Sequence, residues 1–263
     1  MSMKNKIKTI YDSVAMSSNC VCEQDCSPAT AAEKLGYSVE ELSTAPAASN
    51  LGLSCGNPLA IAGLKEGEYV LDLGSGAGFD SFQAAAKVAH SGKVVGIDFS
   101  IPMVEKARSI AVMRGISNVA FIHADIEALP VKSGAFDIVI SNCVLNLVTN
   151  KEKVYQEVYR ALKTGGRISI ADVALLRPMP ANLRYIFSQG PSCLESAITV
   201  DEYLGILEKI NFQNITITTK PIGACFAEDS SDPLGALAGQ SFCAQGLSPD
   251  DYITSIQIEA IKG

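Results

Sequence analysis

The sequence predicts an α/β fold in which helices cover a mostly parallel sheet, and three observations predict it. From residue 69 onward, short apolar segments alternate with longer segments whose apolar residues have helical spacing. A glycine-rich turn joins the first of these strands to the helix that follows it. Of the 263 residues, 48% are apolar and 19% are charged. That composition provides a sizeable core for one large domain, or for one domain with an appended module.

The chain before residue 69 is predicted to be mostly irregular, with two short helices. Apolar residues at helical spacing predict an amphipathic helix over residues 1–17. Ser38 and Glu41 have the spacing of a capping box, which predicts a short helix over 38–42. Residues 44–58 are rich in small residues, Asn, Gly and Pro, and predict an irregular loop.

The middle of the chain supplies the alternating strands and helices. Five buried strands are predicted, at 69–74, 93–98, 118–125, 136–142 and 167–173. Three helices are predicted, at 78–89, 102–115 and 151–163. Gly115 is typical of the residue that ends a helix. Strands that are joined through helices are expected to run parallel.

The alternation loosens after residue 175. Residues 177–193 are predicted to be a connection, and residues 223–250, rich in Gly, Ser and Ala, to be irregular. Thr199 and Glu202 again have the spacing of a capping box, here for a helix over 199–210. Two more strands are predicted, at 215–219 and 253–262.

The net charge of the chain limits the kinds of molecule that it is expected to bind. With 21 basic and 28 acidic residues, the chain carries a net charge of −7, and its isoelectric point is near 4.9. Such a charge argues against general binding of nucleic acid. No run of about 20 apolar residues is present, so no membrane span is expected. The basic start of the chain lacks the apolar segment of a secretion signal, so a cytoplasmic location is expected.

The sequence VLDLGSGAGFD predicts a nucleotide-type loop between the first strand and the first helix. Gly74, Gly76 and Gly78 allow a tight turn and close approach of a ligand. Asp98 ends the next strand, where a carboxylate can accept both hydroxyls of a ribose. Dinucleotide sites have the spacing G-x-G-x-x-G, whereas this loop has G-x-G-x-G preceded by Asp72. This form resembles the class I S-adenosylmethionine (SAM)-dependent methyltransferases, with the dinucleotide site as the less favoured reading.

Cysteines are predicted to gather at the mouth of the same site. Asn142 and Cys143 end the fourth strand, and ligands of open α/β sheets bind at that edge. Topology places Cys55 and Cys193 on the same rim. Three converging thiolates suit a soft ion, and trivalent arsenic bound by three sulfurs keeps a lone pair that can act as a nucleophile. Zinc is the alternative ion for a site of three thiolates, although it prefers four ligands.

The remaining cysteines and the histidines have less definite roles. The loop that contains Cys20, Cys22 and Cys26 is compatible with a zinc site, a redox site or no role. Cys225 and Cys243 are expected to act as small hydrophobic residues. The two histidines fall on helix and strand patterns, and are expected to be packing or surface residues: His90 and His123.

Seven motifs together resemble the arsenite methyltransferases. They are GYSVEEL, SNLGLSCGNP, GEYVLDLGSGAGFD, VVGIDFSIPMVEKAR, IEALPV, SNCVLNL and CLESAI. The resemblance covers residues 36–220 and, through the last strand, 253–262. It implies a Rossmann-like class I SAM-dependent methyltransferase fold with an antiparallel final strand and a small C-terminal extension. The implied parts are an N-terminal cysteine-bearing segment and lid (1–66), a SAM-binding core (67–175), and a C-terminal part with the arsenic-binding loop and the last strands (176–263).

The resemblance also implies the residues of the site. Cys143 and Cys193 would bind As(III), with Cys55 as the third thiolate. An N-terminal cysteine would pair with Cys55; Cys22 is our choice, with Cys20 and Cys26 left open. SAM would be bound by Asp72, Gly74, Ser75, Gly76, Asp98, Phe99, Asp125, Ile126, Glu127 and Asn142.

The implied substrates are arsenite or methylarsenite as thiol adducts, with glutathione or a thioredoxin-type protein as reductant. The sequence departs from the family pattern in three places. Phe99-Ser100 replaces Met-Thr, Ser81 replaces a cysteine, and the N-terminal cysteines are not adjacent. These differences bear most on which N-terminal thiol takes part in redox steps.

Three alternatives remain at this stage. The chain could be a C-, N- or O-methyltransferase of a small molecule, which would need a general base or an activated substrate. It could be a non-catalytic protein that binds a metal or metalloid through thiols, and methyl transfer would exclude that reading. It could be a zinc-dependent thiol methyltransferase, which stoichiometric zinc would favour.

Overall fold

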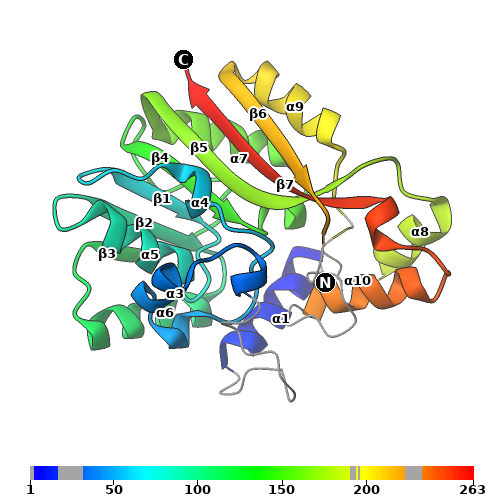
Figure 1. Ribbon diagram of the computed structural model, residues 1–263, viewed down its shortest axis with the longest axis horizontal. Helices are drawn as coiled ribbons and strands as arrows, with labels where there is room; N and C mark the ends of the chain where they lie inside the picture. Colours follow the sequence, from blue (N-terminus) through cyan, green and yellow to red (C-terminus); the bar gives the residue numbers. More distant parts are fainter. Residues whose placement is uncertain (1–2, 17–31, 190–193, 195, 223–232) are drawn as a thin grey trace.

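A single seven-stranded sheet forms the centre of the computed structural model, which describes residues 3–16, 32–189, 194, 196–222 and 233–263 (Figure 1). The strand order is β3-β2-β1-β4-β5-β7-β6. The strands are β1 (Tyr69–Leu73), β2 (Lys93–Asp98), β3 (Val119–His123), β4 (Phe136–Asn142), β5 (Leu162–Leu175), β6 (Phe212–Lys220) and β7 (Ile253–Lys262). β7 runs antiparallel to β5 and β6, and the other pairs are parallel. The predicted fold class, including the antiparallel final strand, is confirmed.

Helices cover both faces of this sheet (Figure 1). One face carries α4 (Leu59–Ala62), α5 (Phe79–Val88) and α6 (Ile101–Arg114), and the other carries α7 (Lys151–Ala161) and α9 (Val200–Lys209). Successive side chains of β1 point to opposite faces of the sheet and pack against both helix layers. Val70 packs in the cluster that contains Val88 of α5, whereas Leu71 packs in the cluster that contains Val158 of α7. This burial on both faces explains the nearly continuous apolar strands of the sequence.

Local capping fixes where several helices begin. The Ser38 hydroxyl accepts the Glu41 N–H at 3.1 Å, and the Glu41 carboxylate accepts the Ser38 N–H at 3.0 Å, at the start of α3 (Val39–Thr44). Thr199 and Glu202 make the same pair of bonds at the start of α9. Both predicted capping boxes are therefore confirmed.

Three helices outside the sheet form a second apolar cluster with its edge. They are α1 (Met3–Met16), α8 (Ala181–Gln189) and α10 (Pro233–Cys243). Ile7 of α1, Phe187 of α8 and Phe242 of α10 are buried in one cluster with the ends of β5 and β7. In Figure 1 α1 and α10 lie below the sheet, and α8 lies at the right, above α10.

Two predictions for the last third of the chain are wrong. The connection at 177–193 contains α8, and the described part of the irregular segment 223–250 contains α10 and the short η4 (Pro249–Asp251). In α10 small residues and glycine weaken the helical periodicity. Both helices are stabilised by burial in one cluster with α1 rather than by local pattern. β5 also begins at Leu162, five residues before the predicted start. None of the helices in the described ranges is long and apolar enough to span a membrane.

Candidate active site

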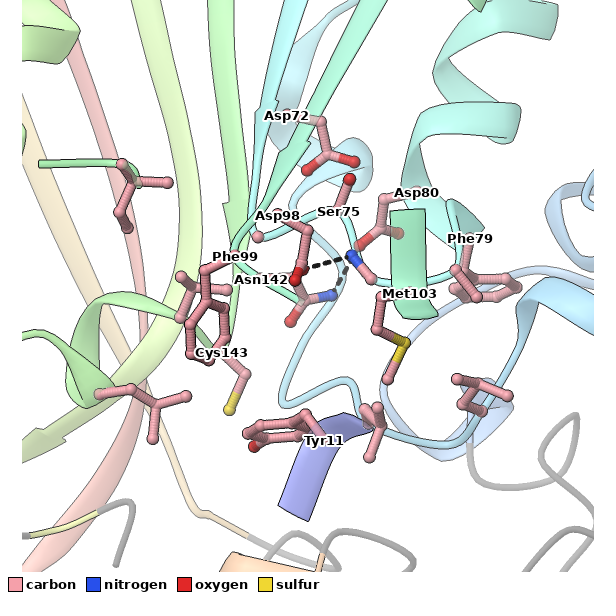
Figure 2. A pocket seen from close by; sticks show the side chains of 18 of the residues that line it. Tyr11, Asp72, Ser75, Phe79, Asp80, Asp98, Phe99, Met103, Asn142 and Cys143 are labelled. Atoms are coloured by element: carbon pink, nitrogen blue, oxygen red, sulfur yellow. Dashed lines mark hydrogen bonds between the residues drawn. The ribbon is translucent and has the colours of Figure 1, made fainter. Parts of the chain in front are cut away.

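A pocket opens at the carboxyl ends of β1, β2 and β4, where α1 lies across its mouth (Figure 2). Its walls come from α1, the loop before Cys55, the glycine loop, the end of β2, the loop after β3, and the turn after β4. All ten residues predicted to bind the cofactor line it: Asp72, Gly74, Ser75, Gly76, Asp98, Phe99, Asp125, Ile126, Glu127 and Asn142. Their gathering at one place follows from the parallel order of the strands.

The three glycines of the loop have different tasks. All have positive φ, at 67° for Gly74, 50° for Gly76 and 93° for Gly78, so the predicted tight turn is confirmed. A side chain on Gly74 would collide with Val144, and one on Gly78 with Phe121. Only Gly76 faces open space. The missing side chains of Gly74 and Gly78 therefore accommodate protein atoms.

Asp98 is a buried acceptor at the end of β2. Its carboxylate accepts the Gly76 N–H at 2.9 Å and the Ser100 N–H at 2.8 Å. Burial raises its pKa, and these two backbone bonds oppose the rise. Lone pairs remain free on the carboxylate. The hydroxyl of Ser75 is also buried in the pocket wall and has no hydrogen-bond partner there. The free lone pairs of Asp98 fit the hydroxyls of a ribose, and the unpaired Ser75 hydroxyl marks a polar position in the wall.

The pocket wall is acidic. Among the described residues that line it, one is basic, Lys4, and five are acidic: Asp72, Asp80, Asp98, Asp125 and Glu127. Burial raises the pKa of Asp80 to about 6 and, together with the neighbouring charge of Asp80, raises that of Asp72 well above its usual range. A cation would favour the ionised form of these acids. The wall thus fits the sulfonium and ammonium groups of SAM better than the phosphates of a dinucleotide.

Helix α1 closes the pocket with polar contacts that the sequence did not indicate. Lys4 forms an ion pair with Asp125 and lies 4.0 Å from Glu127. Asp12 accepts a hydrogen bond of 2.6 Å from the hydroxyl of Ser100. The amphipathic pattern of α1 predicted a buried face, but no local signal could identify which polar residues of α1 meet the pocket.

The structure brings two of the predicted arsenic ligands together. Cys55 and Cys143 form a disulfide with their Cα atoms 5.5 Å apart. Cys143 has a φ of 58°, a left-handed conformation that is rare outside glycine, and its N–H donates to the Ala171 carbonyl at 2.8 Å. Figure 2 shows its sulfur on the side of the pocket that α1 closes. A disulfide-bonded pair of cysteines, of which Cys143 lines the pocket, therefore lies at the pocket wall.

The other predicted cysteines add no ligand within the described residues. Those that lie outside the described ranges are Cys20, Cys22, Cys26, Cys193 and Cys225. Cys243 is an exposed free thiol on α10, so its expected role as a small buried residue is wrong. In the part of the chain that is described, no three His, Cys, Asp or Glu side chains are grouped to hold a metal ion. His90 and His123 are exposed, as expected for surface residues.

A buried acid and a buried lysine hold the turn after Cys143, and no local sequence signal indicates either of them. The Asp172 carboxylate accepts the Leu145 N–H at 2.7 Å, and burial raises its pKa to about 6. Lys151 donates to the Val148 carbonyl at 2.8 Å and to the Ser196 carbonyl. Burial lowers the pKa of Lys151 to about 8. This lysine thus links the turn after Cys143 to residue 196, three positions beyond Cys193.

Comparison with known proteins identifies the family of the chain. The family model of a methyltransferase domain matches residues 64–211. An arsenite methyltransferase from Halobacterium salinarum is 38% identical over 208 residues, which are 79% of this chain and 53% of the relative. The human arsenite methyltransferase is 38% identical over 153 residues, which are 55% of this chain and 41% of the relative. The chain thus spans about half the length of these relatives.

A solved structure resembles the whole fold. It is an arsenic(III) S-adenosylmethionine methyltransferase from Chlamydomonas reinhardtii, 29% identical, with a TM-score of 0.63. The match covers 88% of this chain and 73% of that one. The chain therefore belongs to the methyltransferase-domain family, has the class I SAM-dependent methyltransferase fold, and is related to the arsenite methyltransferases.

Proposed function

We propose that the protein transfers the methyl group of SAM to trivalent arsenic held by cysteine thiolates, in a role of arsenic detoxification. One observation carries the proposal: Cys143 lines the pocket whose acidic lining fits SAM, and its sulfur is bonded to that of Cys55. Cys193 is the proposed third thiolate.

Arsenic binding requires reduced thiols. A glutathione or thioredoxin-type reductant would convert the Cys55–Cys143 disulfide into two thiols and become oxidised to its own disulfide. Arsenite or methylarsenite, arriving as a thiol adduct, would then exchange its sulfur ligands for the thiolates of Cys55, Cys143 and Cys193. Each exchange releases one carrier thiol, which takes up the proton.

Orientation by the protein would supply most of the rate enhancement. Bound SAM supplies an electrophilic methyl group on a positively charged sulfur. Asp98 would hold the ribose, and the acidic residues around Asp72 would favour the positive charge. The thiolates would aim the arsenic lone pair at the methyl group, so no general base is needed. Such alignment can lower a barrier by about 7–11 kcal/mol.

The transfer balances as a displacement. A carbon–arsenic bond forms, the carbon–sulfur bond of the methyl donor breaks, and S-adenosylhomocysteine leaves with the electron pair. Arsenic is then formally pentavalent. Two thiols that become a disulfide would return it to the trivalent state, and Cys22 with Cys55 is the proposed pair. A reducing compartment such as the cytoplasm suits this cycle.

Arsenic stoichiometry tests the site directly. Reduced protein is incubated with arsenite, freed of excess arsenic by gel filtration, and analysed by elemental mass spectrometry. About one arsenic per chain is expected for the wild type, with a large loss in Cys143→Ser and in Cys55→Ser. Cys243→Ser, which changes an exposed thiol on α10, is the matched control. Equal arsenic in Cys143→Ser and the wild type would contradict the proposed ligand set.

A further inference from the structure

A hydrogen-bonded cluster next to the Cys55–Cys143 disulfide joins three segments that are distant in the sequence. It consists of Tyr37, Asp80 of α5 and Asn142 of β4. The Tyr37 hydroxyl donates to the Asp80 carboxylate at 2.6 Å, and the Asn142 amide donates to the other oxygen of Asp80 at 3.0 Å. The same amide nitrogen lies 2.9 Å from the Tyr37 oxygen. Asp80 and Tyr37 are buried, so the bonds form in a region of low dielectric where they are strong.

The amide of Asn142 continues this cluster into the loop that carries Cys55. Its oxygen accepts the Cys55 N–H at 3.1 Å, and its nitrogen donates to the Gly56 carbonyl at 2.8 Å. Asn142 directly precedes Cys143 in the chain. One side chain thus connects the backbone of the first cysteine to the residue before the second.

The orientation of that amide is set by Asp80 and Tyr37. A carboxylate accepts but does not donate, so it binds the nitrogen end of Asn142 and turns the oxygen end toward Cys55. The cluster uses both ends of the amide. Asn142 therefore holds the backbone around Cys55, although its side chain also lines the cofactor pocket.

We propose that Tyr37, Asp80 and Asn142 form a positioning cluster that sets the distance between the Cys55 and Cys143 thiols before arsenic binds. This inference deepens the proposed function and rests on it, because the two thiols are ligands of the proposed arsenic site. The three residues act through the backbone of Cys55 and are positioning residues.

The effective concentration of the thiol pair tests the proposal without SAM or arsenic. The full-length protein is equilibrated in mixtures of reduced and oxidised glutathione. One oxidised glutathione takes two electrons from the two thiols, which gives the protein disulfide and two reduced glutathione molecules. Differential alkylation and peptide mapping then report the Cys55–Cys143 pair separately from the other cysteines.

Tyr37→Phe removes only the hydroxyl that orients the cluster. Tyr203→Phe is the matched control, because the Tyr203 hydroxyl is equally buried and has no hydrogen-bond partner. We expect the effective concentration to fall roughly threefold to tenfold in Tyr37→Phe, the size of one lost hydrogen bond, and to stay unchanged in Tyr203→Phe. Asn142→Ala, which removes the bond to the Cys55 N–H itself, should lower it further, and it serves as the second variant if Tyr37→Phe does not fold.

Three results would overturn the proposal. The first is a wild-type value in Tyr37→Phe or in Asn142→Ala. The second is an equal fall in Tyr203→Phe, which would indicate general loosening. The third is a wild-type thiol pair that forms no disulfide with oxidised glutathione. If arsenic fails to bind but Tyr37→Phe still lowers the effective concentration, the cluster positions the thiols and the proposed function is wrong.

Discussion

Asp98 combines two tasks in one carboxylate. It fixes the glycine loop by accepting the Gly76 N–H, and it presents its remaining lone pairs to the pocket. Because the carboxylate is buried, each added hydrogen bond is stronger than it would be in water. The residue therefore links the shape of the loop to the affinity for the cofactor.

Asp98→Ala is expected to weaken SAM binding by about tenfold to a hundredfold, the size of a lost hydrogen bond to a charged group. Arsenic binding by the reduced thiols should remain, since Asp98 makes no bond to Cys55 or Cys143. Titration calorimetry with SAM measures the first effect. Asp201→Ala, on the exposed first turn of α9, is the control. An unchanged SAM affinity in Asp98→Ala would remove Asp98 from the cofactor site.

Asp80 should leave a signature in the pH dependence of stability. Burial raises its pKa to about 6 in the folded state, against a usual value of 3.8. The folded state therefore holds a proton that the unfolded state has lost between about pH 4 and 6, and stability falls as the pH rises through that window. Asp80→Asn lacks this effect. Its unfolding free energy relative to the wild type should rise from pH 4 to pH 6 by up to about 3 kcal/mol.

Urea unfolding at each pH measures that difference. Asp201→Asn controls for the loss of an exposed charge, because Asp201 lies on the surface of α9. A difference between Asp80→Asn and the wild type that is constant with pH would show that Asp80 ionises normally in the folded protein.

Residues of the site differ in how far sequence could identify them. The glycine loop, Asp98 and Cys143 could be predicted, because each stands at a strand end or in a local motif. Tyr37 and Lys151 could not. Their roles depend on tertiary contacts with Asp80 and with the Ser196 carbonyl, which lie 43 and 45 residues away in the chain.

At the scale of elements, α1 acts as a cover. Ile7 anchors its apolar face in the cluster that contains Cys55. Lys4 pairs with Asp125 of the pocket wall, and Asp12 accepts a hydrogen bond from Ser100. Burial raises the pKa of Asp12, but hydrogen bonds from Lys8 and Ser100 outweigh it and lower the pKa overall. The helix is thus held by two apolar clusters, which contain Ile7 and Ala15, and by a few polar bonds. We expect it to act as a lid that opens for cofactor exchange.

Asp12→Ala should speed the dissociation of SAM. The variant loses the 2.6 Å bond from Ser100 and the ion pair with Lys8, and one such partly exposed interaction corresponds to roughly a fivefold change. Stopped-flow fluorescence with a competing ligand measures the rate. Ser13→Ala, exposed on the same helix, is the control. Equal dissociation rates in Asp12→Ala and the wild type would mean that α1 does not gate the pocket.

The layer formed by α7 and α9 contains two buried hydroxyls without partners, on Tyr155 and Tyr203. A buried hydroxyl that makes no hydrogen bond destabilises the folded state. Tyr203→Phe keeps the ring and should raise the unfolding free energy by about 1 kcal/mol. Thermal and urea unfolding check this. A loss of stability in Tyr203→Phe would indicate that the hydroxyl has a bound partner.

At the scale of the whole molecule, the sheet could be predicted from the sequence. The cap, the group formed by α1, α8 and α10, could be predicted only for α1. The alternation of strands and helices between residues 69 and 173, interrupted only between β3 and β4, predicts the parallel part, because each apolar strand must be covered on both faces. The antiparallel β7 was implied by the family resemblance rather than by its own pattern. α8 and α10 escaped prediction, since they are stabilised by contact with each other and with α1.

This arrangement places the cofactor pocket and the thiol pair between the sheet and the cap. Cys55 belongs to the cluster formed by α1, α8 and α10, while Cys143 follows β4 directly. Reduction of the disulfide would leave two thiols aligned at the boundary of these two parts. The central claim is that this boundary is where arsenic receives its methyl group.

Product speciation tests that claim most directly. The purified protein is incubated with SAM, glutathione and arsenite, and the arsenic species are separated by chromatography coupled to elemental mass spectrometry. The account predicts methylated arsenic with the wild type and none with Cys143→Ser, which should still bind SAM. Unmethylated arsenic alone from a wild-type protein with SAM bound, or full methylation by Cys143→Ser, would contradict it.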